Sequence, residues 1–278
     1  MGSYLRPDTL DGALAALEAG PRTLLVGGTD IYPTRVGRFV DDDILDVSGL
    51  PDLRAISVTD AMCRIPALAT WTDLLRSDLP ARFDGLKTAA RAVGGVQIQN
   101  RGTICGNVCN ASPAADGLPN LMALNARVEL ASSSGRREVP VGEFVIGNRR
   151  TVRRPDELVT ALLVPIPAGH ARSVFLKLGS RAYLVISIAM VAAVAELDAD
   201  GRIASTRIVV GACSEVPQGL PEAEARLVGS PPGPEAAALI EPGDLASLRP
   251  IDDVRATADY RRQVALVLVR RAVAELGS

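Results

Sequence analysis

The stretch GGVQIQNRGTICGNVCNASPAAD, residues 94–116, decides how this 278-residue chain is interpreted. Its centre, Thr103-Ile104-Cys105-Gly106-Asn107, combines a glycine with hydroxyl and amide side chains, and Gly102 stands just before it. Glycine lets backbone approach a ligand closely, and bare backbone N–H groups can form a hollow that binds anions. The stretch therefore favours a ligand with phosphate oxygens, although ordinary tight turns would have the same composition.

A second glycine-rich segment, Val26-Gly27-Gly28-Thr29-Asp30, follows the apolar run from Arg22 to Val26, which is typical of a buried strand. Two such segments facing one another would suit a diphosphate, whose charge is spread over several oxygens. Neither G-x-G-x-x-G opening a helix nor G-x-x-x-x-G-K-[ST] is present, so Rossmann and P-loop sites are not supported. Each segment is expected to follow extended chain, Val96 to Arg101 in the second case.

The pattern around these segments predicts an α+β protein. A helix over Thr9 to Glu18, capped by Thr9 and ended by Gly20, and strands at 22–26 and 43–47 indicate a small βαβ-type unit. Further elements are predicted as strands 65–69, 126–131, 158–166, 174–178, 185–197 and 203–211, and as helices 71–79, 85–92, 118–124, 221–227, 235–240 and 254–276. A domain boundary is expected at Pro167 to His170.

Composition excludes several classes of protein. The chain is 47% hydrophobic and 22% charged with a net charge of -2, and only 3% of it is aromatic, so nucleic-acid binding is not expected. The longest apolar stretch, Ala182 to Ala195, is shorter than the roughly 20 residues that span a bilayer. The N-terminus has no apolar signal core, so we expect no membrane span and a cytoplasmic location.

Cysteine and histidine offer little catalytic chemistry. Cys105 and Cys109 are four residues apart, but no second cluster supplies further ligands, so we expect no metal site and interpret the four cysteines as small apolar fillers. The single histidine, His170, lies in an apparently exposed Pro-Ala-Gly-His turn without a nucleophile pattern. No catalytic residue is therefore assigned on this chain.

Residues 94–116, together with Val26 to Asp30, resemble the signature of the flavin subunits of molybdenum hydroxylases, the medium chains of the xanthine dehydrogenase and carbon monoxide dehydrogenase family. The resemblance extends over nearly the whole chain, including Lys177 to Arg181 and Arg207 to Ala212. It implies an FAD-binding domain of the PCMH type over residues 1–167, with subdomains of about 1–55 and 56–167. A smaller C-terminal domain with an antiparallel sheet and helices would cover residues 170–278.

The resemblance also implies function and partners. The chain would be an FAD-binding electron-transfer subunit, an oxidoreductase component that assembles with a small iron–sulfur subunit carrying two [2Fe–2S] clusters and a large molybdopterin subunit. We expect a dimer of heterotrimers. Substrate would be hydroxylated on the molybdopterin chain, and electrons would pass through the clusters to FAD and then to NAD⁺, oxygen, a quinone or another acceptor.

Site residues follow from the matching positions. The first segment would wrap the FAD diphosphate, the second would hold it from the other side, and Asp116 after Ser112 would contact a cofactor hydroxyl. Val159 would offer backbone to the ring system, Lys177 would lie near the flavin, and Ile186 would lie against its ring. The complete expected set is Leu24, Leu25, Val26, Gly27, Gly28, Thr29, Asp30, Ile31, Gly102, Thr103, Ile104, Cys105, Gly106, Asn107, Ser112, Asp116, Val159, Lys177 and Ile186.

Two positions depart from the family pattern. Cys105 stands where relatives often have a glycine, so a backbone contact could be lost there. Val185 stands where relatives have an acid in Arg-x-x-x-Asp, and neighbouring Ile186 is the position that faces the ring, so electron exit could differ at that face. No cysteine-rich insert is present, so the extra cluster of the benzoyl-CoA reductase branch is not expected.

Two other interpretations remain open at the level of sequence. The chain could be a self-sufficient FAD-dependent oxidase or reductase of the same fold, but such an enzyme needs its own acid–base groups, which are few here. It could also be a non-catalytic nucleotide-binding or scaffold protein. Substrate-dependent bleaching of the isolated flavoprotein would identify the former, and a bound nucleotide without flavin absorbance would identify the latter.

Overall fold

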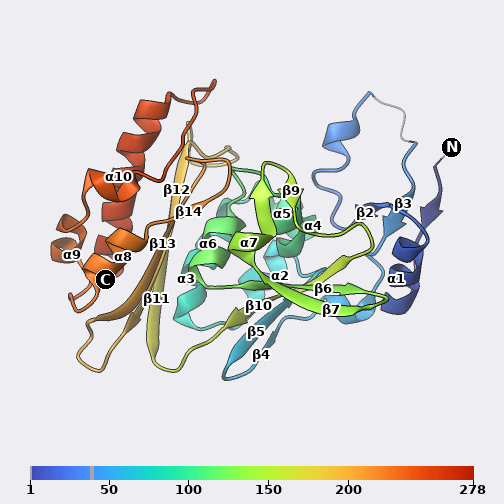
Figure 1. Ribbon diagram of the computed structural model, residues 1–278, viewed down its shortest axis with the longest axis horizontal. Coiled ribbons are helices and arrows are strands. Elements are labelled where there is room, and N and C mark those ends of the chain that lie inside the picture. The colour runs from blue at the N-terminus through green and yellow to red at the C-terminus, as the bar shows by residue number, and fades with distance from the viewer. Residues whose placement is uncertain (1, 38–40) are drawn as a thin grey trace.

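The computed structural model describes residues 2–37 and 41–278. The described chain forms an elongated molecule with its first and last residues at opposite ends (Figure 1). In the described residues, three larger sheets of three, five and four strands and one two-stranded sheet are present, and helices pack between and around them. This arrangement confirms the α+β class.

The first unit is a small parallel sheet with one helix. Strands β1 (Tyr4–Leu5), β2 (Thr23–Leu25) and β3 (Ile44–Asp46) pair in parallel in the order β1-β3-β2, and helix α1 (Leu10–Glu18) joins β1 to β2. The Thr9 hydroxyl accepts a hydrogen bond from the Gly12 N–H at 3.1 Å and so caps α1. The predicted βαβ-type unit is confirmed. A short 3-10 helix, η1 (Pro33–Arg35), lies between β2 and β3, and a second, η2 (Pro51–Leu53), follows β3.

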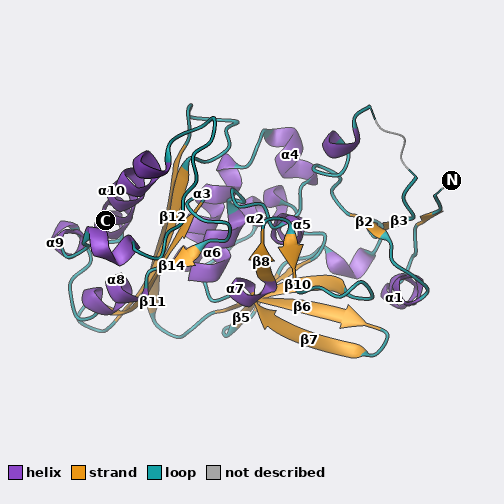
Figure 2. Cartoon of the chain, turned by 45° about the horizontal axis from the view of Figure 1, so that its top comes forward, coloured by secondary structure: helices purple, strands orange, loops and turns teal. Residues whose placement is uncertain are grey.

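The second unit is a five-stranded antiparallel sheet covered by helices. Its strands β4 (Ser57–Val58), β5 (Met62–Pro66), β6 (Arg127–Ser132), β7 (Gly135–Pro140) and β10 (Leu158–Pro165) are ordered β4-β5-β10-β6-β7. Figure 2 shows this sheet beneath the helices that come between β5 and β6. Those elements are α2 (Trp71–Arg76), η3 (Ala81–Phe83), α3 (Asp84–Ala92), α4 (Val96–Arg101), α5 (Ile104–Asn110) and α6 (Gly117–Ala123). A short helix α7 (Val141–Phe144) and the hairpin of β8 (Val145–Gly147) and β9 (Arg150–Thr151) precede β10.

The third unit is an antiparallel sheet between two layers of helices. Its strands run in the order β11 (His170–Leu178), β12 (Ala189–Leu197), β13 (Ile203–Gly211) and β14 (Gln218–Gly219). Helices α3 and α6 cover one face, while α8 (Pro221–Leu227) and α10 (Ala258–Glu275) cover the other (Figure 1). A short helix α9 (Pro234–Ala238) and the 3-10 turn η4 (Pro242–Leu245) connect α8 to α10. Because β12 is buried on both faces, residues 189–195 are apolar without alternation.

Three sequence predictions about secondary structure are wrong. Val96 to Arg101 is not extended but forms helix α4, and the second glycine-rich segment is not a loop but begins helix α5. The strand predicted from Val185 begins only at Ala189, because its pairing with β11 starts at Leu178 and Ala189 and residues 179–188 form the connection between the two strands. The remaining predicted elements are present with ends shifted by a few residues, and His170 is exposed as predicted.

Candidate functional site

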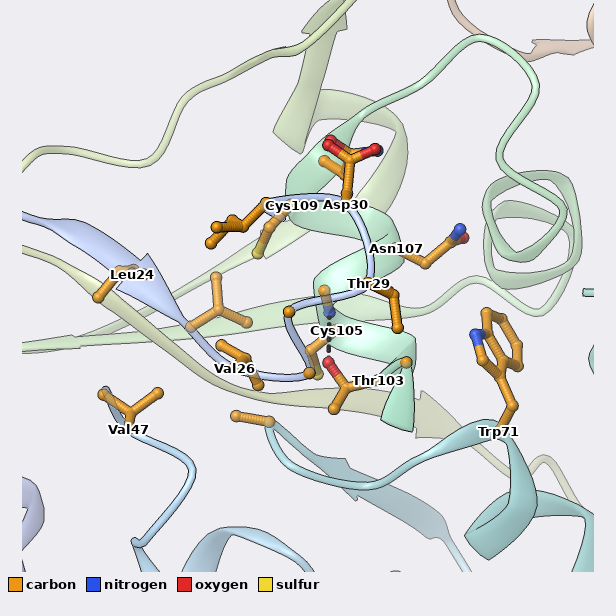
Figure 3. Close-up of a pocket in the computed structure, with 18 of the residues that line it drawn as sticks. Leu24, Val26, Thr29, Asp30, Val47, Trp71, Thr103, Cys105, Asn107 and Cys109 are labelled. Atoms are coloured by element: carbon orange, nitrogen blue, oxygen red, sulfur yellow. Dashed lines mark hydrogen bonds between the residues drawn. The ribbon is translucent and has the colours of Figure 1, made fainter. Parts of the chain in front are cut away.

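A cavity of about 390 Å³ lies between the Val26–Ile31 loop and helix α5. This volume is within the range of pockets that bind small molecules. Figure 3 shows the loop crossing beside α5, with Thr29 and Asp30 on the loop near Asn107 and Cys109 of the helix. The residues that line the cavity are Leu24, Val26, Gly27, Gly28, Thr29, Asp30, Ile31, Val47, Ala67, Trp71, Val93, Ile98, Gly102, Thr103, Cys105, Gly106, Asn107, Cys109, Asn110, Leu158 and Val159. The structure therefore brings together the two glycine-rich segments, which are about 75 residues apart in sequence.

The glycines of the first segment allow its close approach to the second. A Cβ on Gly27 would lie 2.1 Å from the carbonyl oxygen of Arg101, so only glycine fits there without movement of the backbone. Gly28 has φ of +73°, which reverses the chain beyond β2. Gly27 does not need positive φ, so the two neighbouring glycines serve different purposes.

The first segment leaves a run of backbone donors without partners. Among the hydrogen bonds of the described residues, none has the N–H of Gly27, Gly28, Thr29, Asp30 or Ile31 as its donor. Backbone donors in a folded protein normally find a partner. Successive free N–H groups beside a cavity form the kind of hollow that binds phosphate oxygens. This part of the sequence prediction, an anion-binding nest in the first segment, is supported by the geometry.

The second segment is organised differently from the prediction. Thr103 is the N-cap of α5, and its Oγ1 accepts a hydrogen bond from the Gly106 N–H at 3.0 Å (Figure 3). The N–H groups of Ile104 and Asn107 donate to the carbonyl oxygens of Ala69 and Thr103. Three of the five N–H groups of Thr103 to Asn107 are therefore already bonded, so this segment does not present an unbroken run of free donors as the first segment does. What this segment presents to the cavity is side chains, chiefly those of Thr103 and Asn107.

Several wall residues were missed by sequence reasoning. Trp71, the only tryptophan, is 1% exposed and follows a Thr70–Asp73 capping box. Val47 follows β3, and the carboxyl ends of neighbouring parallel strands meet at one edge of a sheet, so its place beside the β2 loop could have been inferred. The missed wall residues are Val47, Ala67, Trp71, Val93, Ile98, Cys109, Asn110 and Leu158. They are mostly apolar, so much of the cavity lining outside the glycine-rich segments is apolar.

Six predicted residues do not line this cavity. Leu25 and Ile104 are buried in the core, and Ser112 accepts a hydrogen bond from the Ala114 N–H. Ile186 is 63% exposed on the turn before β12. The remaining two, Asp116 and Lys177, contact each other.

Asp116 and Lys177 form a buried ion pair between the second and third units. The Lys177 ammonium lies 2.7 Å from Asp116 Oδ2, and the Ser187 hydroxyl donates to Asp116 Oδ1 at 3.1 Å. Burial raises the pKa of Asp116, and the Lys177 ammonium opposes that rise. Asp116, for which the resemblance implies contact with a cofactor hydroxyl, and Lys177, which it places near the flavin, are thus adjacent, at the junction of the β11–β14 sheet with α6.

Arg149 forms hydrogen bonds to residues on both sides of the cavity. Sequence reasoning did not select this residue. It lies in the turn between β8 and β9, and its Nη1 donates at 2.8 Å both to Asp30 Oδ2 and to Asn110 Oδ1. Asp30 lines the cavity from the first segment and Asn110 from the end of α5. No local sequence signal connects residues 119 positions apart.

The cysteines are free and mostly buried. Cys63, Cys105 and Cys213 are buried, and Cys109 is half-buried in the cavity wall. Cys105 packs in the core with Sγ 3.6 Å from the carbonyl oxygen of Ile65, so its side chain points away from the ligand-facing backbone. Among the described residues, no group of three or more His, Cys, Asp or Glu side chains is arranged to hold a metal ion. In the same part of the chain, no helix combines the length and apolarity needed to cross a membrane.

The fold and the cavity define an α+β protein with a ligand-sized cavity between two glycine-rich segments, and comparison with known proteins gives its family. Residues 1–167 match the family model described as the FAD binding domain in molybdopterin dehydrogenase. Residues 175–276 match the model described as the CO dehydrogenase flavoprotein C-terminal domain. The chain therefore belongs to the family of FAD-binding medium subunits of molybdenum hydroxylases, and it is an oxidoreductase component.

Individual relatives agree over nearly their whole length. The chain is 31% identical to the glyceraldehyde dehydrogenase medium chain of Sulfolobus acidocaldarius, covering 99% of this chain and 98% of that one. It is 29% identical to a xanthine dehydrogenase FAD-binding subunit of Escherichia coli, over 98% and 95% of the two chains. A solved carbon monoxide dehydrogenase structure from Hydrogenophaga pseudoflava superimposes with a TM-score of 0.89 at 28% identity, covering 99% of this chain and 96% of that one. The fold and family predicted from sequence are confirmed.

Proposed function

We propose that this chain binds FAD with its diphosphate against the Gly27–Ile31 loop and serves as the electron-transfer subunit of a multi-subunit molybdenum hydroxylase. The run of five free backbone N–H groups in that loop is the observation that carries the proposal. It matches the anionic centre of a dinucleotide cofactor. FAD is also the cofactor named for the family to which the chain belongs.

The residues present fit the proposed cofactor. Thr103 and Asn107 face the loop across the cavity and offer hydroxyl and amide groups, and the apolar wall provides a dry surface for an aromatic ring. When bound, FAD would accept electrons and release them singly or in pairs. The protein's part is to hold it, exclude water and tune its charge. In this proposal Asp116 and Lys177 act at the flavin end, where the Lys177 cation would favour a reduced, anionic ring.

The cavity itself argues against a self-sufficient oxidase. Asp30 is the only acid among its described lining residues, and Arg149 pairs with it. Burial raises the pKa of Cys109 to about 11 and also raises that of Cys105, so neither thiol is a ready base. The cavity therefore offers no free group that could take a proton from a substrate. Substrate chemistry on a partner chain fits this composition better.

In the complete proposal, electrons arrive from [2Fe–2S] clusters of a small partner chain and leave to an external acceptor. A large molybdopterin chain would carry out the hydroxylation, and two heterotrimers would associate. We also propose a cytoplasmic location, which the four free thiols support.

The direct test is the visible spectrum of the purified chain, before and after incubation with FAD. We expect the absorbance of a bound flavin. A chain that is folded by circular dichroism, remains colourless and does not take up FAD would refute the proposal. Co-expression with the neighbouring cysteine-rich and molybdopterin-type chains, followed by light scattering, tests the assembly separately.

A further inference from the structure

Arg149 occupies an unusual backbone position. Its φ is +55°, and its N–H donates to the carbonyl oxygen of Ala111 at 2.9 Å, where α5 ends in a left-handed residue. A left-handed conformation is unfavourable for a long side chain and persists only where its surroundings fix it. The β8–β9 turn is thus docked onto the end of α5, and the arginine side chain extends from there towards the first segment.

The guanidinium joins the two sides of the cavity. Its Nη1 donates to Asp30 Oδ2 and to Asn110 Oδ1, each at 2.8 Å, and Nη2 reaches Asp30 Oδ1 at 3.4 Å. In Figure 3 the Asp30 carboxylate points away from Thr103, on the outer side of the loop. This two-nitrogen contact fixes the loop relative to the helix in a way that a single point charge could not.

The charge on Arg149 also matters for an anionic ligand. Asp30 carries a carboxylate next to the free N–H groups of the loop, and a diphosphate bound there would be repelled by that carboxylate if it were unpaired. The bond to Asp30 raises the pKa of Arg149, so the guanidinium stays charged. Both side chains are about half exposed, so in the absence of ligand the pair itself contributes little to stability.

We propose that Arg149 is a positioning residue of the cofactor site, a clasp that holds the Gly27–Ile31 loop against α5 and sets how slowly FAD is released. The inference rests on the proposed function, because it assigns Arg149 to the same cofactor. Arg149 need not touch FAD itself. It acts through Asp30 and Asn110, by fixing the loop and by balancing the carboxylate beside the diphosphate.

The neighbouring Arg150 provides a matched control. It is the first residue of β9 and its side chain is similarly exposed, but it pairs with Glu215 at 3.5 Å instead of with a cavity residue. An effect of hairpin charge or hairpin stability alone would therefore appear in R150Q as well as in R149Q. Faster FAD release caused by loss of the contacts of Arg149 with Asp30 and Asn110 would appear only in R149Q.

The experiment measures FAD release from the full-length chain by stopped-flow fluorescence for wild type, R149Q, R149K, R150Q, D30N and the R149Q/D30N double variant. We expect R149Q to release FAD about tenfold faster, a change equivalent to one order of magnitude in affinity, and R150Q to match wild type. R149K should release FAD at a rate between those of wild type and R149Q, because lysine keeps the positive charge but lacks the two nitrogen donors of the guanidinium group. The double variant should release FAD more slowly than R149Q, because no bare carboxylate remains, and added salt should narrow the gap between R149Q and wild type.

The outcomes separate this inference from the proposed function. If wild type binds FAD and R149Q releases it no faster than R150Q, the clasp is disproved while the proposed function stands. If wild type does not bind FAD, the proposed function and the proposed role of Arg149 are both disproved. Should R149Q fail to fold, the release rates of R149K and D30N test the proposed role of Arg149 instead. If both variants release FAD at the wild-type rate, that role is disproved.

Discussion

The ammonium of Lys177, on strand β11, lies 2.7 Å from the carboxylate of Asp116, just before helix α6, and both side chains are almost fully buried. This pair joins the four-stranded sheet to the helices of the second unit. Ser187, at the end of the turn that leads into β12, donates to the same carboxylate. Arg255 in turn donates to the Ser187 carbonyl oxygen at 3.2 Å. The turn with the exposed Ile186 is therefore anchored through Asp116.

The first prediction concerns this pair. D116N would leave a buried ammonium without its counter-charge, so the free energy of unfolding should fall by about 3–5 kcal/mol. A D116N/K177M double variant should recover much of that loss, because the unpaired cation is gone. Urea denaturation of the apo-chain measures both values. If Lys177 also acts on the flavin, the double variant should bind FAD with a lowered reduction potential, because a cation near the ring favours its reduced anion.

An exposed ion pair serves as the control. Asp259 and Arg262 are three residues apart in α10, and their side chains are 88% and 50% exposed. D259N should therefore change the free energy of unfolding by less than about 1 kcal/mol. Equal losses for D116N and D259N would show that burial of the Asp116–Lys177 pair has no energetic consequence.

The second prediction concerns the close approach of the two glycine-rich segments. A Cβ on Gly27 would lie 2.1 Å from the Arg101 carbonyl oxygen, and backbone cannot rotate away as a side chain can. G27A should lower the free energy of unfolding by about 1–3 kcal/mol and should weaken FAD binding by displacing the loop. Isothermal titration with FAD and urea denaturation measure the two effects.

Gly243 is the comparison for G27A. Nothing lies within 4 Å of a Cβ built there, and the residue is distant in sequence from both cavity segments. G243A should leave FAD binding unchanged and should alter stability only slightly. A G27A variant that binds FAD as wild type does would mean that the Gly27–Arg101 contact does not shape the site.

Part of the fold could be predicted because the residues carry local signals. Thr9 and Gly20 bound α1, and the uninterrupted apolar run of β12 indicates a strand buried on both faces. Helix α4 could not be predicted in this way. In Val96-Gln97-Ile98-Gln99 apolar and polar residues alternate as in a strand, but the structure leaves Val96 and Ile98 partly exposed on a short helix. Without a buried face, no helical periodicity develops.

The residues of the candidate site could likewise be predicted only in part from the sequence. The two glycine-rich segments could be selected because they occur as a pair and because residues 94–116 resemble a long family signature, and the structure places both segments around one cavity. Arg149 could not be selected, because its contact with Asp30 depends on the docking of the β8–β9 turn onto α5. The roles of Asp116, Lys177 and Ile186 at the flavin remain predictions, since they lie outside the cavity lining.

The third prediction concerns acid stability. Glu157, which directly precedes the cavity residues Leu158 and Val159, is 1% exposed and accepts hydrogen bonds from Arg137 and Arg154. Burial works to raise its pKa, but the bonds from the two arginines outweigh burial and bring the pKa down to about 2. E157Q should therefore lower the free energy of unfolding at neutral pH by about 2–3 kcal/mol.

The sign of the pH dependence follows from the lowered pKa. An unfolded glutamate has an ordinary pKa near 4.5, so its contribution is complete above that pH and is lost as the pH falls towards 2. The gap between wild type and E157Q should narrow over this interval in urea denaturation series. Glu138 forms an exposed ion pair with Arg127 on the same sheet. E138Q should therefore neither lower the free energy of unfolding at neutral pH nor show a difference from wild type that narrows at acid pH. A gap that stays constant from neutral to acid pH would contradict the role given to Glu157.

The fourth prediction uses Cys109 as a reporter of where the cofactor lies. Its thiol is half-buried in the cavity wall, and burial raises its pKa to about 11, so alkylation at neutral pH should be slow but measurable. FAD in the proposed position would cover the thiol and suppress the reaction further. Cys63 and Cys213 are buried in the core, do not line the cavity, and should react only after unfolding, with or without FAD. Mass spectrometry of peptides after timed iodoacetamide labelling measures each site, and C109A identifies the reporting peptide. Because these two thiols lie in the same chain, they correct for any general stabilisation by FAD. Equal labelling of Cys109 in the presence and absence of bound FAD would place the cofactor elsewhere than between the Gly27–Ile31 loop and helix α5.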